Sequence, residues 1–237
     1  MQARQLPLDL GRWPSFAPED FLVTESNREA SAWVDRWPDW PGPAIVIHGP
    51  RGAGKSHLLA VWCRRAQASG IDGTALGQGE AGDPGRWLGD REARIGIDDA
   101  DRVVGNPDGE RALLHLYNAV AERRGTMLLT AGRPPAHWRL DLADLASRLR
   151  AAPAVALTAP DDTLLAVVLA KLFADRQLRV PGDVIGYVAG RIERSFPAAE
   201  RAVDEIDALS LRLRRSITLA LVSRHWRPGD RGDPAIG

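Results

Sequence analysis

Short apolar runs alternate with helical patterns through the first two thirds of the chain. The runs are of the kind found in strands that are covered on both faces, and they occupy residues 44–48, 94–97, 126–130 and 154–157. Between them, apolar residues at three- and four-residue spacing predict helices at about 55–69 and 111–124. This order of strands and helices predicts an α/β fold in which a parallel sheet is flanked by helices.

Beyond residue 160 the pattern is helical only. Asp161 can cap a first helix, a second begins near Pro181, a third runs over about 197–215, and Thr218 can cap a short fourth. These helices are expected to form a small C-terminal lid. The whole pattern therefore predicts four segments, which are an extended tail at 1–12, an α/β base at 13–158, the lid at 159–226 and a flexible end at 227–237.

Composition places the chain among ordinary globular proteins. Of its 237 residues, 44% are hydrophobic and 26% are charged, which excludes a mainly disordered chain. The single cysteine, Cys63, cannot form an internal disulfide, and no apolar run reaches the roughly 18 residues of a membrane span. The start of the chain lacks the long apolar stretch of a secretory signal, so we expect a cytoplasmic protein without a membrane partner.

The charge balance argues against a protein that wraps nucleic acid. The chain carries 31 basic and 31 acidic residues, so it has no global positive field, and any contact with DNA has to be local. Lysine occurs only as Lys55 and Lys171, and nearly every other basic residue is arginine. This indicates that position 55 needs the compact point charge of an ammonium group. The five histidines show no metal-ligand spacing, so no zinc site is expected.

The strongest chemical signal is a glycine-rich loop between the strand predicted at 44–48 and the helix that follows it. The loop reads Gly49-Pro50-Arg51-Gly52-Ala53-Gly54-Lys55-Ser56, a complete G-x-x-x-x-G-K-[ST] or Walker A motif. Its glycines let backbone N–H groups turn into an anion-binding nest at a helix N-terminus. Lys55 is expected to reach the outer phosphates of a nucleotide and Ser56 to ligate Mg²⁺. The alternative is a glycine-rich turn that matches by chance.

A second group of candidates follows the strands predicted at 94–97 and 126–130. Asp98 is expected to hold Mg²⁺ directly or through water, and Asp99 to orient or deprotonate an attacking water. Adjacent carboxylates can instead cap the next helix, and Asp101 is expected in solvent or in a cap. Thr130 is the only uncharged polar side chain at the end of its strand, where nucleotide switches usually place a sensor.

Two further features have alternatives that the sequence leaves open. Leu6, Leu8 and Leu10 alternate in the Pro-containing segment that begins at Gln5. This spacing predicts either an edge strand of the fold or a peptide whose leucines insert into a partner's groove. Arg148 lies in a helical pattern before the last strand, where an arginine normally faces solvent or forms an ion pair.

Several of these motifs together resemble one family. The chain resembles the AAA+ domain of the bacterial initiator DnaA, and most closely the shortened Hda-type members of its family. The resemblance rests on the Walker A motif, Asp98-Asp99, Leu116-Tyr117-Asn118, Arg133-Pro134-Pro135, the segment 144–149 and the trailing helices. The resemblance spans nearly the whole chain. Hda-type proteins lack the initiator's C-terminal helix-turn-helix domain and begin with a Gln-Leu-x-Leu-x-Leu peptide that docks on the DNA polymerase sliding clamp. The residues that match that peptide are Gln5, Leu6, Leu8 and Leu10.

The resemblance implies a P-loop AAA+ fold that binds ADP or ATP with Mg²⁺. Arg148 would be an arginine finger presented to nucleotide on a neighbouring AAA+ subunit, and Arg194 the lid arginine that senses phosphates in cis. Gly132 departs from the family, because relatives often have an acidic sensor there, and this predicts weak hydrolysis at the protein's own site. The residues expected at the nucleotide are Phe21, Gly49, Gly52, Ala53, Gly54, Lys55, Ser56, His57 and Arg194.

The function that the resemblance implies is negative regulation of DNA replication initiation. The nucleotide-bound protein would dock on the sliding clamp and stimulate hydrolysis of DnaA-bound ATP through Arg148. The expected partners are DnaA and the clamp's beta subunit, with DNA reached through the clamp and a homo-oligomer left open. Two alternatives remain, which are a clamp-tethered adaptor of DnaA without a catalytic group and a self-sufficient P-loop ATPase of the helicase-loader type.

Overall fold

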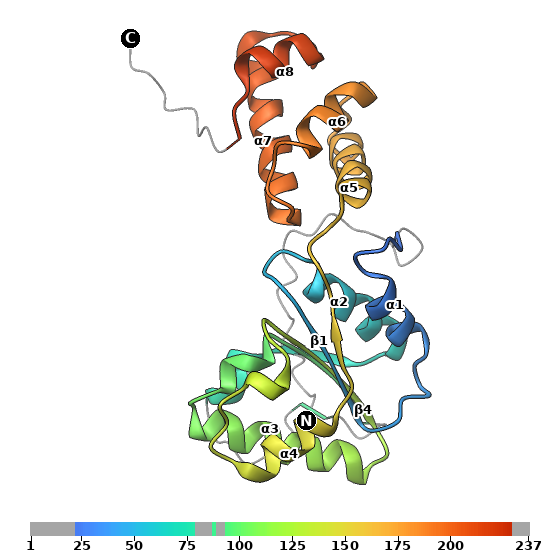
Figure 1. The fold of residues 1–237 in the computed structure, drawn as a ribbon, viewed down its shortest axis with the longest axis vertical. Coiled ribbons are helices and arrows are strands. Elements are labelled where there is room, and N and C mark those ends of the chain that lie inside the picture. The colour runs from blue at the N-terminus through green and yellow to red at the C-terminus, as the bar shows by residue number, and fades with distance from the viewer. Residues whose placement is uncertain (1–21, 79–86, 89–92, 229–237) are drawn as a thin grey trace, which may run out of the picture. The chain divides into compact units, whose positions relative to one another are not determined.

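A computed structural model of the chain describes residues 22–78, 87–88 and 93–228 (Figure 1). The chain divides into two compact units. An α/β unit contains Asn27–Thr158, and a helical unit contains the stretch from Ala159 onward. Within the described residues, no helix is both long enough and apolar enough to cross a membrane.

The α/β unit is built on a five-stranded sheet with the order β2-β3-β4-β1-β5. Its strands are β1 (Ala44–His48), β2 (Ser69–Asp72), β3 (Arg94–Asp98), β4 (Thr126–Ala131) and β5 (Ala154–Ala156). Every pairing is parallel, which confirms the predicted α/β fold with a parallel sheet. Because parallel strands end at the same edge, the residues that follow β1, β3 and β4 are brought together there.

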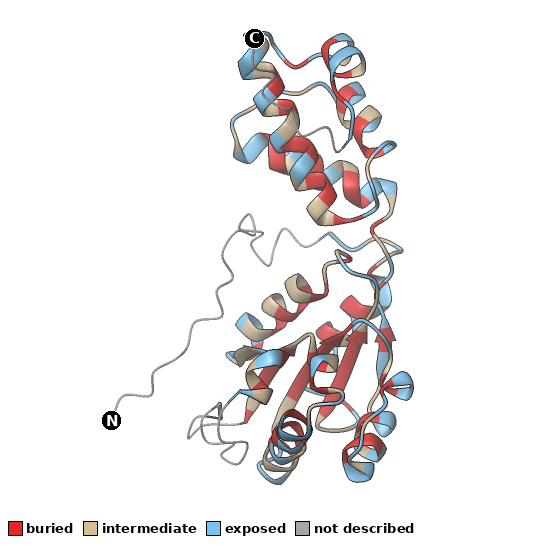
Figure 2. Ribbon diagram, turned by 90° about the vertical axis from the view of Figure 1, so that its left-hand side faces the viewer, coloured by how far each residue is buried: buried red, intermediate tan, exposed pale blue. Residues whose placement is uncertain are grey.

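Helices cover both faces of this sheet, so its central strands are buried (Figure 2). One face carries α1 (Arg28–Asp35) and α2 (Lys55–Ala66), and the other carries α3 (Pro107–Glu122) and α4 (Ala143–Ala151) (Figure 1). Val46 of β1 packs in one apolar cluster with Leu113 of α3 and Leu149 of α4. This two-sided burial explains why the strands read as continuous apolar runs in the sequence.

One strand of the sheet is missing from the sequence prediction. The helix expected at about 55–69 ends at Ala66, because Gln67 adopts a left-handed conformation with φ 51°. Residues 69–72 form β2 instead, at the edge of the sheet beside β3. β2 reads Ser-Gly-Ile-Asp, and its residues are partly buried or exposed. A short edge strand of this kind has no apolar run from which it could be predicted.

The helical unit contains the four helices that the sequence predicts. They are α5 (Asp162–Asp175), α6 (Gly182–Ala189), α7 (Phe196–Leu213) and α8 (Leu219–His225). Side-chain oxygens of Asp161, Ser195 and Thr218 each accept a hydrogen bond from the backbone N–H three residues on, so three of the helices begin with a cap. Their apolar faces meet in a single core that includes Phe173 and Ile206.

The described residues 22–26 belong to the helical unit, whereas the sequence placed them in the α/β base. Thr24 and Ser26 of this segment form hydrogen bonds with Asp161, the residue that caps the N-terminus of α5. Burial raises the pKa of Asp161, but hydrogen bonds from Leu164, Thr24 and Ser26 outweigh it and bring that pKa below its ordinary value. Two hydroxyl-bearing residues therefore tie this short segment to the first helix of the helical unit.

Candidate functional site

The glycine-rich loop joins β1 to α2 at the carboxyl edge of the sheet. Gly52, with φ 77°, and Gly54, with φ 96°, lie in the left-handed region, which glycine enters without steric penalty. Gly54 directly precedes α2, and its carbonyl accepts the N–H of Leu58 at 3.0 Å. The loop thus ends in the first turn of a helix, where the first N–H groups have no intrahelical partner and attract anions.

Gly49 fixes where the loop begins. Its N–H donates to the carbonyl of Ala131 at 3.1 Å, and the neighbouring His48 carbonyl accepts from Leu157 at 2.7 Å. A Cβ added to Gly49 would lie 1.9 Å from the Leu157 carbonyl oxygen. The loop therefore begins between the end of β4 and the residue after β5, in a space that admits only glycine.

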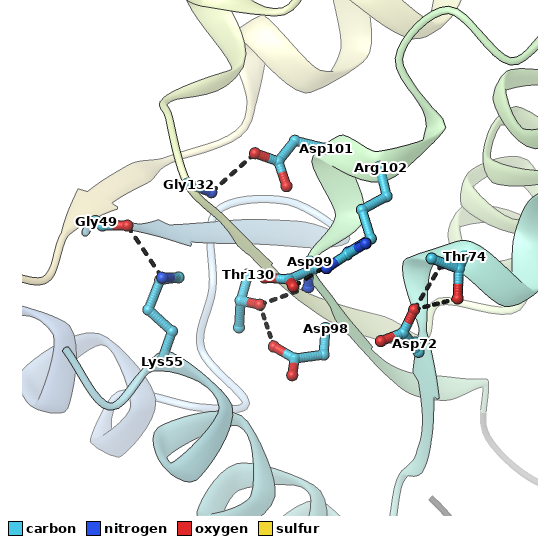
Figure 3. Close-up of polar contacts among 10 residues, drawn as sticks. All are labelled: Gly49, Lys55, Asp72, Thr74, Asp98, Asp99, Asp101, Arg102, Thr130 and Gly132. Carbon is cyan, nitrogen blue, oxygen red and sulfur yellow. Dashed lines mark hydrogen bonds and ion pairs between the residues drawn. The ribbon is translucent and has the colours of Figure 1, made fainter. Parts of the chain in front are cut away.

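Lys55 is the first residue of α2, and its side chain lies back over the loop (Figure 3). Its Nζ donates to the carbonyls of Gly49 at 3.0 Å and Pro50 at 2.9 Å, and only 7% of the residue is exposed. An ammonium has three donors, so it can bind a phosphate oxygen with the third or by exchanging a carbonyl. Ser56 and His57 follow in the same first turn of α2.

His48, the last residue of β1, affects the charge of the loop. Burial, followed by the positive charges of His137 and Lys55, lowers the pKa of His48 below its ordinary value. A base with a lowered pKa is neutral over a wider range of pH. At neutral pH His48 therefore carries a positive charge less of the time than an ordinary histidine does.

Asp98 and Asp99 lie where β3 ends, next to the end of β4 (Figure 3). The Thr130 hydroxyl donates to Oδ1 of Asp98 and accepts from the N–H of Asp99 at 2.9 Å. Thr130 is fully buried, whereas Asp98 and Asp99 are partly exposed. One hydroxyl thus fixes the carboxylate of Asp98 and the backbone of Asp99 at the strand end where the sequence predicted a sensor.

Asp99 turns the chain out of the sheet into the short 3₁₀ helix η4 (Ala100–Val103). It has φ 49°, and its Oδ2 pairs with Arg102 Nε at 3.2 Å. Its side chain makes no capping hydrogen bond to η4. The alternative in which Asp99 serves as a helix cap therefore does not describe its contacts, and its proposed action on water remains a prediction.

Asp101, which was expected in solvent or in a cap, lies partly exposed in the first turn of η4. Its Oδ2 also accepts a hydrogen bond from the N–H of Gly132 at 2.9 Å, which the sequence did not predict (Figure 3). A Cβ added to Gly132 would lie 3.2 Å from the same oxygen. The turn of η4 folds Asp101 back over the end of β4, so a carboxylate lies beside the position that has no side chain of its own.

The oxygen donors at this edge fit a shared Mg²⁺ site. Mg²⁺ usually takes one or two protein oxygens and completes its shell with phosphate and water. Ser56 at the start of α2 and Asp98 at the end of β3 offer one hydroxyl and one carboxylate. Over residues 22–78, 87–88 and 93–228, no three His, Cys, Asp or Glu side chains gather to hold a metal unaided. A Mg²⁺ ion held by Ser56 and Asp98 would complete its coordination shell with oxygens of phosphate and water.

Arg148 projects from α4 of the same unit. Its Nε donates to Asp144 Oδ1 at 3.0 Å, one helical turn earlier, and its guanidinium lies 5.6 Å from the centre of the Tyr117 ring. The Arg148 side chain is 38% exposed. It is therefore an ion-paired surface arginine, which was one of the open alternatives, and a second molecule can reach it.

Glu110, which no sequence pattern singled out, holds the start of α4. This residue of α3 is fully buried, and its Oε2 accepts from Asp141 at 2.9 Å and Leu142 at 3.0 Å. Its Oε1 accepts from Gly105 at 3.2 Å. Leu142 precedes α4 and makes no side-chain cap, so the acceptor comes from Glu110 instead. In the sequence, Glu110 looks like an ordinary acid in the first turn of a helix.

Other predicted site residues lie elsewhere. Arg194 belongs to the helical unit, between α6 and α7, where its Nη2 pairs with Asp162 at 3.1 Å and both side chains are mostly exposed. The predicted residues outside the described part of the chain are Gln5, Leu6, Leu8, Leu10 and Phe21.

The chain is similar to proteins of known sequence and to solved structures. The chromosomal replication initiator protein DnaA of Thermomicrobium roseum is 29% identical over 238 residues, a match that covers 92% of this chain and 50% of that protein. The chain thus spans about half the length of this relative. No family model matches the chain.

Two solved structures show the fold that the chain shares. Domain III of the Thermotoga maritima replication initiation protein DnaA matches with a TM-score of 0.73 at 17% identity, covering 89% of this chain and 95% of that one. AMPPCP-bound DnaA from Aquifex aeolicus matches with a TM-score of 0.66 at 19% identity, covering 85% and 69%. At these identities the likeness shows the fold, which is a P-loop AAA+ domain followed by helices, as predicted.

Proposed function

The chain is a DnaA-like AAA+ protein, and from this premise we propose that it binds an adenine nucleotide and negatively regulates replication initiation. In this proposal it docks on the sliding clamp through Gln5, Leu6, Leu8 and Leu10. There it stimulates hydrolysis of ATP on DnaA by presenting Arg148 as an arginine finger. Its own ADP or ATP, bound with Mg²⁺, sets the shape of the protein rather than supplying turnover.

The geometry of the loop supports nucleotide binding. Two glycines with positive φ, a helix N-terminus and the Lys55 ammonium are placed together at one edge of the sheet. These features orient N–H donors and positive charge toward an anion of phosphate size. AMPPCP-bound DnaA from Aquifex aeolicus has the same fold, and because AMPPCP is an ATP analogue, this favours adenosine di- or triphosphate as the ligand.

The observation that carries the regulatory proposal is the placement of Arg148. Its guanidinium is partly exposed on α4, and Asp144 and the Tyr117 ring hold it in place. The buried Glu110 in turn fixes the start of that helix with two hydrogen bonds. A preorganised guanidinium that reaches another subunit stabilises charge on a transferring phosphoryl group, and comparable fingers increase the rate by about 10³ to 10⁵.

Reconstitution of DnaA hydrolysis tests this proposal. ATP-bound DnaA is incubated with DNA-loaded clamp and either intact protein or the Arg148→Ala variant, and phosphate release is followed over time. Loss of the finger is expected to lower stimulation by roughly 10³ or more. Retention of stimulation by Arg148→Ala would show that this guanidinium is not the catalytic group.

Arg150 provides a matched control for that experiment. It is an exposed arginine in the last turn of the same helix, so Arg150→Ala removes the same charge without touching the proposed finger. We expect Arg150→Ala to stimulate hydrolysis as the intact protein does. Equal losses in the two variants would indicate a general electrostatic effect of α4.

Nucleotide binding is tested separately by thermal denaturation. ADP at about 100 times its Kd adds roughly 2.7 kcal/mol to the stability of a protein that binds it. Lys55→Ala is expected to abolish this stabilisation because the ammonium is the loop's charged phosphate ligand. Lys171→Ala removes the chain's other lysine, in α5, and is expected to leave the response to ADP unchanged. An intact protein that does not respond to ADP or ATP would refute nucleotide binding.

Clamp docking is tested through the leucines near the start of the chain. The triple variant Leu6→Ala/Leu8→Ala/Leu10→Ala is expected to lose association with the clamp while keeping its thermal response to ADP. Asp9→Ala changes the intervening polar position and should leave clamp binding intact. Clamp binding that survives the triple variant would assign these leucines to the fold instead.

Two other functions are each favoured by one observation. The ion pair between Arg148 and Asp144 favours an adaptor that tethers DnaA to the clamp without a catalytic group. The hydrogen bonds that the buried Thr130 makes with Asp98 and Asp99 favour a self-sufficient ATPase. The adaptor predicts full stimulation by Arg148→Ala. The ATPase predicts steady turnover without DnaA or clamp, and loss of that turnover in Asp99→Asn.

A further inference from the structure

Charge is unevenly distributed along the helical unit. Residues 159–207 contain nine acidic and six basic residues, whereas residues 208–228 contain five arginines and no acid. The change comes near the end of α7, which is followed by a short loop and α8 (Figure 1). A chain whose total charge is balanced therefore has one strongly basic segment.

The basic segment begins with three arginines close together. Arg212 lies in the last turn of α7, and Arg214 and Arg215 follow directly. All three are exposed, as is Leu211 beside them. We call Arg212, Arg214 and Arg215 the basic end of α7.

Backbone hydrogen bonds hold the basic end in a fixed conformation. The N–H groups of Arg214 and Arg215 donate to the carbonyls of Leu211 and Ser210, each at 3.2 Å, and close the helix. The Ser210 hydroxyl donates to the Arg215 carbonyl at 2.6 Å. The helix end is thus capped by backbone groups and a serine, so these interactions leave the three guanidinium groups free to serve another purpose.

Most arginines elsewhere in this unit have a partner within the protein. Arg176 pairs with Asp204, Arg194 pairs with Asp162, and Arg191 stacks on the Tyr187 ring. Arg227 donates to the carbonyls of Ser223 and Trp226 at the end of α8. In the part of the chain that the structure describes, no carboxylate pairs with an arginine of the basic end.

We propose that the basic end of α7 binds the phosphate backbone of nucleic acid, without preference for sequence. A guanidinium matches phosphate oxygens with two parallel N–H donors, and neighbouring phosphates repeat at short intervals along a strand. This contact is separate from the proposed nucleotide site and clamp peptide, and it does not depend on either.

The chemistry of the surface favours nucleic acid over other anionic partners. A membrane-binding helix needs a broad apolar face, but Leu221 and Val222 of α8 lie in the core and Leu211 is the one large exposed apolar residue described between 208 and 228. A protein interface needs an apolar centre larger than one leucine. Phosphates in a row require only exposed cations, which this segment has.

The test measures binding of the full-length protein to a fluorescent 30-nucleotide strand and its duplex by anisotropy, from about 50 to 200 mM salt. Each phosphate contact contributes a slope of about −0.9 for duplex and −0.7 for single strand in log affinity against log salt. Arg212→Ala/Arg214→Ala/Arg215→Ala is expected to flatten the duplex slope by roughly 2.7 and to weaken binding at least about ten-fold at 50 mM salt.

Two variants control for charge and folding. Arg179→Ala/Arg201→Ala removes two exposed arginines from the acidic part of the unit, so its slope should stay that of the intact protein. Replacing the three arginines of the basic end by lysine keeps the charge and should keep the slope. If the triple alanine variant unfolds, Arg212→Ala alone carries the test, with an expected flattening of about 0.9 for duplex.

Specific outcomes would overturn the proposal. They are an intact protein that binds neither strand nor duplex, equal flattening in the Arg179→Ala/Arg201→Ala control, and an unchanged slope in the basic-end variant. Competition separates the partner classes. Poly-glutamate or phosphatidylserine vesicles that displace the oligonucleotide at equal charge concentration would show that the surface recognises acidic protein or lipid instead.

Discussion

The two units of this protein place polar groups in opposite ways. Among the described residues, the α/β unit buries five polar or charged residues, which are Asn27, Ser31, Lys55, Glu110 and Thr130. The described part of the helical unit buries one, the helix cap Ser195. The α/β unit therefore depends on internal hydrogen bonds that cannot be exchanged for water, whereas the helical unit is held by apolar packing with its charges outside.

The difference shows where each unit can carry function. Parallel strands deliver loops, carboxylates and a lysine to one edge, and buried partners such as Thr130 fix their positions. In the helical unit, by contrast, surface charges can change with little effect on the core. If this contrast is correct, removing a polar group should lower the free energy of unfolding strongly in the α/β unit and only slightly in the helical unit.

The largest expected effect concerns Cys63, the only cysteine, on α2. Burial, and secondarily the negative charge of Asp98, raises the pKa of Cys63 to about 12. At pH 8 the folded protein should contain roughly a thousandth of the thiolate of the unfolded chain, so iodoacetamide should react about 10³ times more slowly. Comparable rates with and without urea would contradict this.

The same shift predicts how stability depends on alkaline pH. Because the pKa of Cys63 is higher in the folded than in the unfolded protein, the buried neutral thiol contributes fully to the free energy of unfolding below about pH 9. This contribution is lost as pH rises toward about 12. Cys63→Ala should therefore weaken the decline of the unfolding free energy above pH 9. An identical decline in the variant would assign the alkaline loss to other groups.

Removing the carboxylate of Glu110 is expected to have the next largest effect. Glu110→Ala leaves the N–H groups of Gly105, Asp141 and Leu142 without their acceptor, which should lower the free energy of unfolding by roughly 3 kcal/mol. Glu110→Gln keeps one acceptor oxygen and should recover part of this loss. Urea denaturation measures both, and the exposed Glu193→Ala in the helical unit should stay within about 0.5 kcal/mol of the intact protein.

Thr130 tests the same principle with a single hydroxyl. Thr130→Val keeps the shape but leaves the N–H of Asp99 without an acceptor, so we expect a loss of roughly 2 kcal/mol in urea denaturation. Thr130→Ser keeps the hydroxyl and should lose less. A valine variant as stable as the intact protein would mean that water can replace this hydroxyl.

The helical unit should show the smallest effect. Thr218 Oγ1 accepts from the N–H of Leu221 at 3.3 Å at the start of α8, and Thr218→Ala is expected to cost about 1 kcal/mol. Thr163 lies exposed in the first turn of α5, and Thr163→Ala serves as a control without a cap. A larger loss for Thr218→Ala than for Glu110→Ala in urea denaturation would reverse the contrast between the units.

Local patterns made much of the fold predictable. The strand-loop-helix order around Gly49–Ser56 follows from residues adjacent in sequence. The capping residues Asp161 and Thr218 likewise predict the starts of α5 and α8. β2 could not be predicted, because an edge strand that reads Ser-Gly-Ile-Asp gains its hydrogen bonds from β3 rather than from an apolar pattern of its own.

The site was less predictable because its contacts join distant residues. Glu110 acts on Leu142, which lies 32 residues away, and nothing around either residue signals the pair. Asp101 reaches Gly132 only because η4 turns back over β4. The Walker A loop could be predicted because its phosphate-binding residues lie in one contiguous segment. The residues that hydrogen-bond to the start of the loop, Ala131 and Leu157, belong to or follow other strands, so they could not be predicted.

The uneven charge of the helical unit has a consequence for how the protein meets a partner. Separated positive and negative regions form an electric dipole, and a dipole near a highly charged polymer experiences a torque even when the net charge is zero. Ions screen this field beyond about 8 Å at physiological ionic strength, so the reorientation belongs to the final approach. This reorientation is expected to raise the association rate constant of the complex, while the dissociation rate constant stays nearly unchanged.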